Sequence, residues 1–84
     1  MMKTNLEICK RIAEIEGISD YIFINYDYNP LTDKALCFDL MVKHNVVFLD
    51  GEASVTTLHS CNGYAEYPDP QKAICLAIID SHKG

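Results

Sequence analysis

An Asp-Gly pair at residues 50–51 is the feature that most constrains the fold of this chain. The residues before it, Val46–Leu49, form a continuous apolar run, and residues 53–61 after it form a longer, more polar run. Asp-Gly is a preferred two-residue connection between antiparallel strands, because both residues of that turn adopt positive φ. The pair therefore predicts a hairpin, and with it a sheet that is largely antiparallel.

A second turn and a closing helix are predicted downstream of this hairpin. Asn62-Gly63 is another two-residue turn signal, and residues 64–67 form a short strand after it. Asp69 and Pro70 then fit the N-cap and the first position of a helix. Because residues 73–79 are apolar on nearly all sides, we expect this helix to be the most buried.

The N-terminal segment predicts an amphipathic helix. Thr4 and Glu7 have the spacing of a capping box, in which each side chain bonds to the backbone of the other residue. Apolar residues recur at helical spacing from Leu6 to Ile15. Gly17 supplies the left-handed residue that commonly ends a helix.

Residues 18–45 predict a strand followed by a second helix. Residues 21–28 are rich in aromatic and β-branched side chains on both faces, which is typical of a strand covered on both sides. Asn29 and Pro30 fit the N-cap and first position of the next helix, and Thr32 is a competing cap. Asn45 can take the left-handed conformation at the end of that helix.

These elements predict one α+β domain, residues 1–84, in the order α-β-α-β-β-β-α. The hairpins make the sheet largely antiparallel, and the apolar residues on both strand faces predict helices on both faces, an α/β/α sandwich. The order of the strands within the sheet stays open.

Composition excludes several classes of function. The chain has 12 acidic and 7 basic residues, a net charge of −5, and no basic cluster beyond Lys10-Arg11, so we expect no direct contact with nucleic acid. No apolar run approaches the roughly 20 residues that span a membrane. The N-terminal segment reads as a charged helix rather than a signal peptide, so we expect a cytoplasmic protein with its four cysteines reduced. Since 49% of the residues are hydrophobic, a homodimer or a partner over an apolar patch is expected.

No set of residues predicts catalysis or metal binding. His59 and Cys61 lie two apart on one predicted strand, but a structural zinc site takes four ligands. A cysteine nucleophile would pair Cys61 with His59 or Cys37 with His44, and neither pair comes with a third, orienting group. We therefore expect a protein that is not an enzyme and needs no cofactor or metal.

The candidate site is a tyrosine-rich patch at the strand ends. If the last strand lies beside the first, its tyrosines would frame a groove at the start of the second helix, where backbone N–H groups suit an anion. The alternative is that the tyrosine rings cap the core with their hydroxyl groups in water. Asp27 and Asp33 have the same two interpretations, as a carboxylate pair or as ordinary strand-end and helix-end residues. The candidate ligand- or partner-binding residues are Tyr26, Tyr28, Asn29, Thr32, Asp33, Tyr64 and Tyr67.

Two short motifs carry a resemblance to a known family. One consists of Tyr28, Pro30, Thr32 and Asp33, and the other is the Ala-Ile-Cys-x-Ala run of residues 73–77. Over about residues 21–80 the chain resembles the phage ABA sandwich domain family, although it lacks the tryptophans that members often carry in their strands. The resemblance implies a phage or prophage origin and a helix-sheet-helix sandwich, and it implies no activity, since the family has no established function.

Together these observations predict a non-enzymatic accessory protein that acts by binding in the cytoplasm of a host bacterial cell. Small phage proteins of this kind are associated with host takeover and with blocking bacterial defences, so the expected partner is a host or defence protein whose basic surface complements the acidic chain. The alternative is a protein that binds or sequesters a nucleotide-like small molecule.

Overall fold

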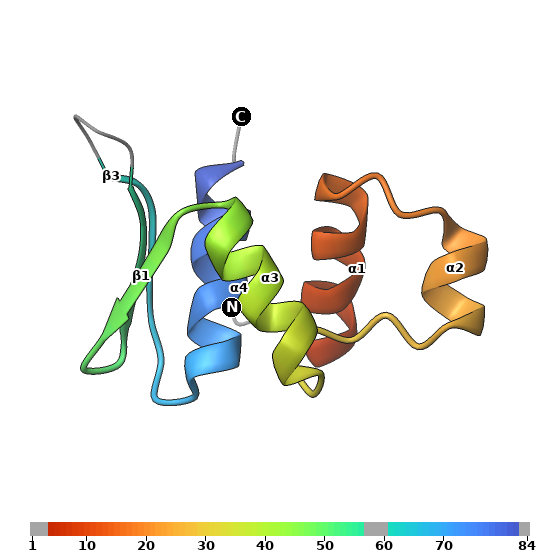
Figure 1. Ribbon diagram of the computed structural model, residues 1–84, viewed down its shortest axis with the longest axis horizontal. Coiled ribbons are helices and arrows are strands. Elements are labelled where there is room, and N and C mark those ends of the chain that lie inside the picture. Colours follow the sequence, from red (N-terminus) through yellow and green to blue (C-terminus); the bar gives the residue numbers. More distant parts are fainter. Residues whose placement is uncertain (1–3, 57–60, 83–84) are drawn as a thin grey trace.

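A computed structural model describes residues 4–56 and 61–82, which form four helices and three strands (Figure 1). The predicted α+β class, the antiparallel sheet and helices packed on it are confirmed. The order is α-α-α-β-β-β-α, because one predicted strand is a helix. The elements are α1 (Asn5–Ile15), α2 (Asp20–Asn25), α3 (Lys34–Lys43), β1 (Val46–Leu49), β2 (Glu52–Thr56), β3 (Cys61–Glu66) and α4 (Pro70–Ser81).

The sheet has the order β1-β2-β3, and both pairs of neighbours are antiparallel. The predicted Asp50-Gly51 turn joins β1 to β2, and both residues have positive φ, 51° and 77°. The last residues of β1 face the first of β2, so that Leu49 lies opposite Glu52. The hairpin prediction is therefore confirmed.

Helix α4 is the centre of the core. It packs against all three strands and against α1 and α3, and six of its residues are buried. Asp69 is its N-cap and Pro70 its first residue, as predicted, although the Asp69 side chain makes no capping hydrogen bond. The predicted apolar segment is thus the most buried helix.

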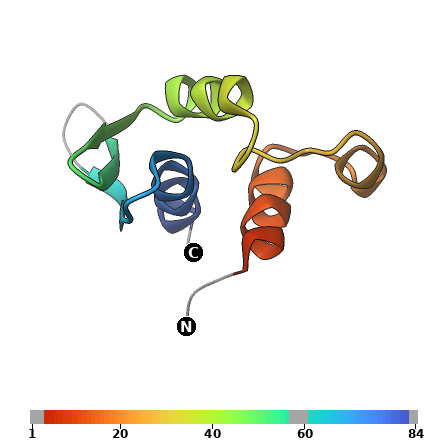
Figure 2. The same cartoon turned by 90° about the horizontal axis from the view of Figure 1, so that it is seen from below.

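The helices lie on one face of the sheet, so the predicted sandwich with helices on both faces is wrong (Figure 2). Ala53 and Val55 of β2 are buried beneath α4, whereas Val47 and Leu49 of β1 are 55% and 70% exposed on the opposite face. The apolar run in β1 therefore reflects one buried face and one open face.

The predicted strand over residues 21–28 is the helix α2. Ser19 caps this helix by accepting a hydrogen bond from the Ile22 amide at 3.3 Å, and Asp20 lies in its first turn. A strand needs a neighbour to pair its backbone, whereas a helix satisfies its own. No strand of the described chain lies beside this segment, so the local capping signal prevails over the β-favouring composition.

The second predicted helix starts later than expected. Asn29 accepts a hydrogen bond from the Leu31 amide at 3.1 Å and so forms a turn around Pro30 instead of capping a helix. Asp33 is the N-cap, because its carboxylate accepts from the Leu36 amide at 3.1 Å. Asn29 and Thr32 are therefore wrong as caps, whereas the predicted left-handed Asn45 is confirmed by its φ of 58°.

The predicted Asn62-Gly63 turn is also wrong, since both residues lie inside β3. Gly63 is there because α4 passes directly over it: a Cβ at this position would lie 2.7 Å from the Cβ of Ser81. The strand predicted over residues 53–61 is observed as Glu52–Thr56, and its remaining residues before Cys61 lie outside the described part.

Candidate functional site

Helix α2 stands apart from the rest of the molecule. It forms one end of the long axis and the sheet forms the other (Figure 1), and it makes no extensive contact with another described helix or strand. None of its six residues is buried. We call residues 19–27, which contain this helix, the arm.

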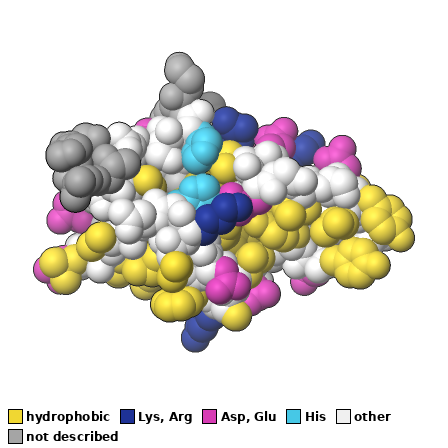
Figure 3. Space-filling view, turned by 45° about the horizontal axis from the view of Figure 1, so that its top comes forward, with side chains coloured by type: hydrophobic (Ala, Val, Ile, Leu, Met, Phe, Trp, Pro, Cys, Tyr) yellow, Lys and Arg dark blue, Asp and Glu magenta, His cyan; other side chains and the backbone are white. Residues whose placement is uncertain are grey.

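The arm exposes large apolar side chains. Ile24 is 74% exposed, and the rings of Tyr21 and Tyr26 lie 6.3 Å apart. Figure 3 shows hydrophobic side chains gathered at the end of the molecule formed by α2, and again over the opposite end. The exposed apolar residues of the arm are Tyr21, Ile22, Ile24 and Tyr26.

The first anchor of the arm is Glu16, at the end of α1. Its carboxylate bonds Lys43 Nζ and His44 Nε2, both at 2.7 Å, which ties α1 to the end of α3. Burial by itself raises the pKa of the Glu16 carboxyl, but the hydrogen bonds from Lys43 and His44 outweigh it and hold the pKa below its usual value. Glu16 is therefore ionised, and its carboxylate links the end of α1 to Lys43 and His44.

The second anchor is the turn at Asn29 and Pro30. The Asn29 side chain accepts a hydrogen bond from the Cys9 thiol of α1 at 3.2 Å, and the Pro30 carbonyl accepts from Gln71 of α4 at 3.0 Å. Pro30 is fully buried. Both ends of the arm are thus fixed to the core, and only the segment between them projects.

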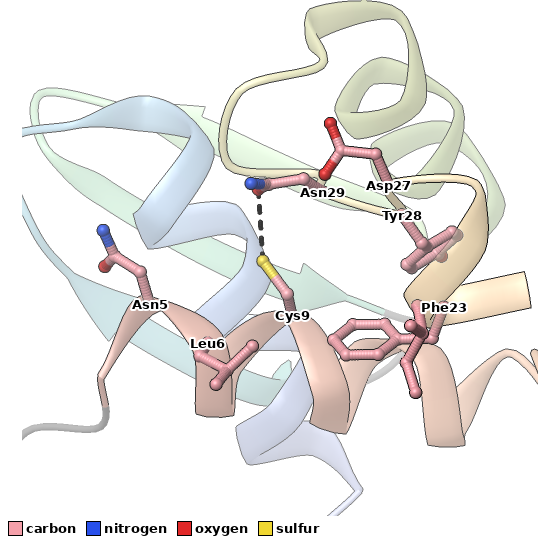
Figure 4. Close-up of a pocket in the computed structure, with 8 residues that line it drawn as sticks. Asn5, Leu6, Cys9, Phe23, Asp27, Tyr28 and Asn29 are labelled. Atoms are coloured by element: carbon pink, nitrogen blue, oxygen red, sulfur yellow. Dashed lines mark hydrogen bonds between the residues drawn. The ribbon is translucent and has the colours of Figure 1, made fainter. Parts of the chain in front are cut away.

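A pocket of about 380 Å³ lies between α1 and the arm (Figure 4). Leu6 and Cys9 of α1 form one side, and Phe23 and Tyr28 form another. Its eight lining residues include one carboxylate and no cationic side chain; they are Asn5, Leu6, Cys9, Phe23, Ile24, Asp27, Tyr28 and Asn29.

The Tyr28 hydroxyl and the Cys9 thiol of the pocket favour their neutral forms. Burial, with the nearby Glu16 carboxylate, raises the pKa of Tyr28 to about 12. Burial also raises the pKa of the Cys9 thiol, which already donates to Asn29. The pocket therefore offers an apolar surface with neutral hydroxyl, thiol and amide groups and one carboxylate, that of Asp27.

The structure divides the predicted site residues among four places. Tyr28 and Asn29 line the pocket, and Tyr26 lies exposed on the arm. Thr32 and Asp33 precede α3, where Asp33 serves as its cap. Of the two interpretations of Asp27 and Asp33, the helix-end role holds for Asp33, which caps α3. Asp27 lines the pocket instead.

The last two predicted residues lie at the far end of the molecule. Tyr64 donates to the Glu52 carboxylate on the open face of the sheet, and that bond, with the nearby Glu66, raises its pKa to about 12. Lys72 lies 4.6 Å from the centre of the Tyr67 ring. The expected groove between these tyrosines and those of residues 26–28 is not formed, because it depended on a strand that is the helix α2.

Sequence reasoning predicts Tyr26 as a site residue but misses the other exposed apolar residues of the arm, Tyr21, Ile22 and Ile24. The predicted strand, covered on both faces, would have buried them. The signal that could have found them is Ser19-Asp20, an N-cap followed by an acid in the first helical turn.

The structure does not bring the predicted Cys37 and His44 pair together in the described residues. No group of three or more His, Cys, Asp or Glu side chains among them is placed to hold a metal ion. Cys37 is buried, and His44 bonds Glu16 instead of a thiol. Cys61 is exposed, and His59, its predicted partner, lies outside the described residues. No helix in the described segments is long and apolar enough to cross a membrane.

Comparison of the chain with protein-family models, with curated proteins and with solved structures gave no match.

Proposed function

We propose that this protein acts by binding another protein through the arm, and that it is not an enzyme. The observation that carries the proposal is the apolar surface of α2, where Tyr21, Ile24 and Tyr26 are each about two-thirds exposed or more. Contiguous exposed apolar surface on a small protein is characteristic of an interaction site.

Helix α2 has reason to need a partner. Isolated helices shorter than roughly 12–15 residues are marginal in water, and β-branched and aromatic residues lower helix propensity further. α2 has six residues and receives little packing from the described core. A groove on a partner would supply the missing burial, as in other complexes in which a helix lies in an apolar groove.

Charge indicates what borders that groove. Residues 16–33 carry four carboxylates and no Lys, Arg or His, a formal charge of −4, out of −5 for the whole chain. Asp20 and Asp27 flank the apolar side chains of α2 directly. Basic side chains at the rim of the partner's groove would steer the encounter and fix its orientation.

The family resemblance supplies the biological setting of the proposal. A phage or prophage accessory protein in the cytoplasm of its bacterial host would use the arm to cover a functional surface of a host or bacterial-defence protein. The mechanism is steric occlusion, which needs affinity and no chemistry. Tyrosine anchors suit this role, because tyrosine is enriched among the residues that dominate binding energy.

The test is affinity capture from bacterial lysate with three immobilised proteins: wild type, Ile24→Asp and Phe38→Asp. Ile24 and Phe38 are both highly exposed, 74% and 62%, but Phe38 lies on α3. We expect one host protein to be retained by wild type and by Phe38→Asp, and its affinity to fall at least about tenfold in Ile24→Asp.

Two further measurements sharpen this experiment. Asp20→Lys should slow association with the captured protein and change its salt dependence, since rim charges act mainly on the association rate. Retention that is equal in Ile24→Asp and wild type would exclude the arm as the binding element. The absence of any specifically retained protein would count against protein binding as a whole.

A second candidate function rests on the pocket between α1 and the arm. It includes Tyr28 and Asn29, and its volume of about 380 Å³ is within the range of small-molecule sites. Asp27 would repel a phosphate, so among nucleotide-like ligands the lining favours an uncharged base or nucleoside. Thermal shifts with nucleosides and nucleotides test this candidate, with Leu6→Trp as the variant that fills the pocket mouth. A nucleoside shift that Leu6→Trp abolishes would support it, and the lack of any shift would reject it.

A further inference from the structure

The two edges of the sheet differ in how their backbone is covered. At the β3 edge, the Tyr64 amide donates to the Asp80 carboxylate of α4 at 3.0 Å. At the β1 edge, no hydrogen bond among the described residues involves the outward backbone groups. One edge of the sheet is thus occupied by a side chain and the other is open.

The register identifies the outward groups of β1. The Thr56 amide donates to the Asn45 carbonyl at 3.1 Å, so the next amide along, that of Val46, points away from β2. The direction of the backbone groups alternates along the strand. The N–H and C=O groups of Val47 and Leu49 therefore point toward β2, and those of Val46 and Phe48 point outward. The open edge presents the N–H and C=O groups of these last two residues.

β1 is short, with four residues, but it carries none of the chemical or geometric features by which proteins protect an edge strand. Its sequence, Val-Val-Phe-Leu, has no charge and no proline, and its pairing with β2 is regular. Exposed apolar edges without such protection are templates for pairing with another strand. Val47 and Leu49 add apolar side chains beside this edge.

A second copy of the same strand fits this edge by symmetry. In an antiparallel pair centred on Val47, Val46 of each copy lies opposite Phe48 of the other. Each copy offers two outward N–H and two outward C=O groups, so the pair forms four hydrogen bonds and leaves none of these groups unpaired. Val47 of each copy then lies beside Val47 of the other on the open face of the sheet.

Helix α3 extends the apolar surface on the same side of the molecule. In Figure 2, α3 and β1 lie on one side, and β3 forms the opposite edge of the sheet. Ala35, Phe38 and Val42 follow one another at i, i+3 and i+7 and are all exposed. Two such helices, brought together by the paired strands, would cover each other's apolar stripe.

Charge does not oppose this contact. Residues 34–49 contain Lys34, Lys43 and Asp39, a net charge of +1, whereas residues 16–33 carry −4. Asp50 and Glu52 follow β1 and lie near Val47 and Leu49, but no carboxylate lies within β1 itself. A strongly acidic or basic partner would find no complementary field there.

We propose that two copies of this protein associate through β1, antiparallel about a two-fold axis at Val47, into one continuous six-stranded sheet. The interface is isologous, with the same surface used by both copies. It does not depend on the arm, which lies at the opposite end of each molecule and stays available for a different partner.

The experiment tests the pairing with charged residues at the two-fold axis: each variant alone places like charges there, and a mixture of two variants places opposite charges there. Like charges directly opposite each other destabilise a strand pair, and Val47 is 55% exposed in the single chain, so its replacement should preserve the fold. We expect wild type to sediment as a dimer, and Val47→Glu and Val47→Lys each as a monomer. An equimolar mixture of the two variants should regain the dimer mass as a heterodimer.

Ile24→Glu, with the charge on the arm, is the matched control and should remain dimeric. Hydrogen exchange adds a residue-level readout: the Val46 and Phe48 amides should be protected in wild type and exchange faster in Val47→Glu. The Val47 and Leu49 amides, which face β2, should be protected in both. A monomeric wild type, a dimeric Val47→Glu, or a variant mixture that stays monomeric would each overturn the proposal, and none of these results would bear on binding through the arm.

Discussion

Gly63 is a residue at which helix α4 and the sheet approach each other closely. A Cβ there would meet the backbone of α4, lying 2.7 Å from the Ser81 nitrogen, and backbone cannot move aside as a flexible side chain can. A glycine is needed here because of the close packing of α4 and not because of a turn. The Asn62-Gly63 pair therefore resembles a turn signal although it lies within a strand.

We predict that Gly63→Ala lowers the free energy of unfolding by about 1–3 kcal/mol, the usual cost of overpacking. Gly17→Ala is the control: nothing lies within 4 Å of a Cβ there, and only its φ of +71° opposes the change. That variant should lose about 1 kcal/mol. Urea unfolding measures both, and a smaller loss for Gly63→Ala than for Gly17→Ala would contradict the close approach.

Glu16 makes the stability of the protein depend on pH. Its folded-state pKa is held below the usual value of 4.5, so its contribution is fully present above that pH and is lost as the pH falls through the lowered folded-state pKa. At neutral pH, Glu16→Gln should lower the free energy of unfolding by about 1 kcal/mol.

The difference between Glu16→Gln and wild type should shrink as the pH falls below 4.5, measured by urea unfolding at a series of pH values. Glu14→Gln is the control, because Glu14 is 57% exposed and its contact with Arg11 is long, 3.9 Å. Its effect should stay under about 0.5 kcal/mol. A pH-independent difference for Glu16→Gln would argue against an ionised link.

Among the elements, α3 shows how a helix start can be misplaced by a few residues. Asn29, Thr32 and Asp33 are all acceptable N-caps by residue type. Only Asp33 reaches an amide one turn ahead, while Asn29 is engaged by Leu31 and Cys9, and Thr32 lies 3.5 Å from the Asn29 carbonyl.

Asp33→Ala should therefore destabilise the protein by about 1 kcal/mol. Thr32→Ala should change the free energy of unfolding by less than about 0.5 kcal/mol, as is usual for exposed positions. Thermal unfolding followed by circular dichroism compares the two. Equal losses, or a larger loss for Thr32→Ala, would place the cap elsewhere.

Elements with local signals were predictable, and those that depend on tertiary neighbours were not. The Thr4 cap, the Asp50-Gly51 turn and the apolar run of α4 each act within a few residues, and all three are confirmed, although the Glu7 carboxylate bonds the Thr4 hydroxyl and not its amide. The composition of α2 favours a strand, and the helix follows from the Ser19 cap together with the absence of a pairing neighbour among the described strands. The pocket at Tyr28 and Asn29 lies where the second helix was expected to begin, but the exposed apolar arm beside it follows from this same misassigned element.

At the scale of the whole molecule, the four cysteines differ in their exposure to solvent. Cys9, Cys37 and Cys75 are buried, and Cys61 is exposed. The hydrogen bond with Cys37, together with burial, raises the pKa of the Cys75 thiol, and burial raises that of Cys9. Thiolate is the reactive form, so Cys9 and Cys75 should react slowly. The hydrogen bond with Cys75 lowers the pKa of Cys37, so burial alone protects that thiol from a reagent.

We predict that a thiol reagent labels Cys61 rapidly in the native protein and labels the other three cysteines only after unfolding. Mass spectrometry after a time course counts and locates the labels. Cys61→Ser serves as the control and should leave almost no rapid labelling. Fast labelling of Cys9 or Cys75 in the native state would show that the core opens more readily than its packing indicates.

The two anchors of the arm have a consequence for how this protein can evolve. Glu16 and Pro30 hold the ends of a segment in which no helical residue contributes to the buried core. Mutations within α2 therefore carry little folding cost, while each one alters the surface that the arm exposes. Under the proposed function, a lineage whose target changes can vary these positions rapidly, and the remainder of the chain can stay under ordinary purifying selection.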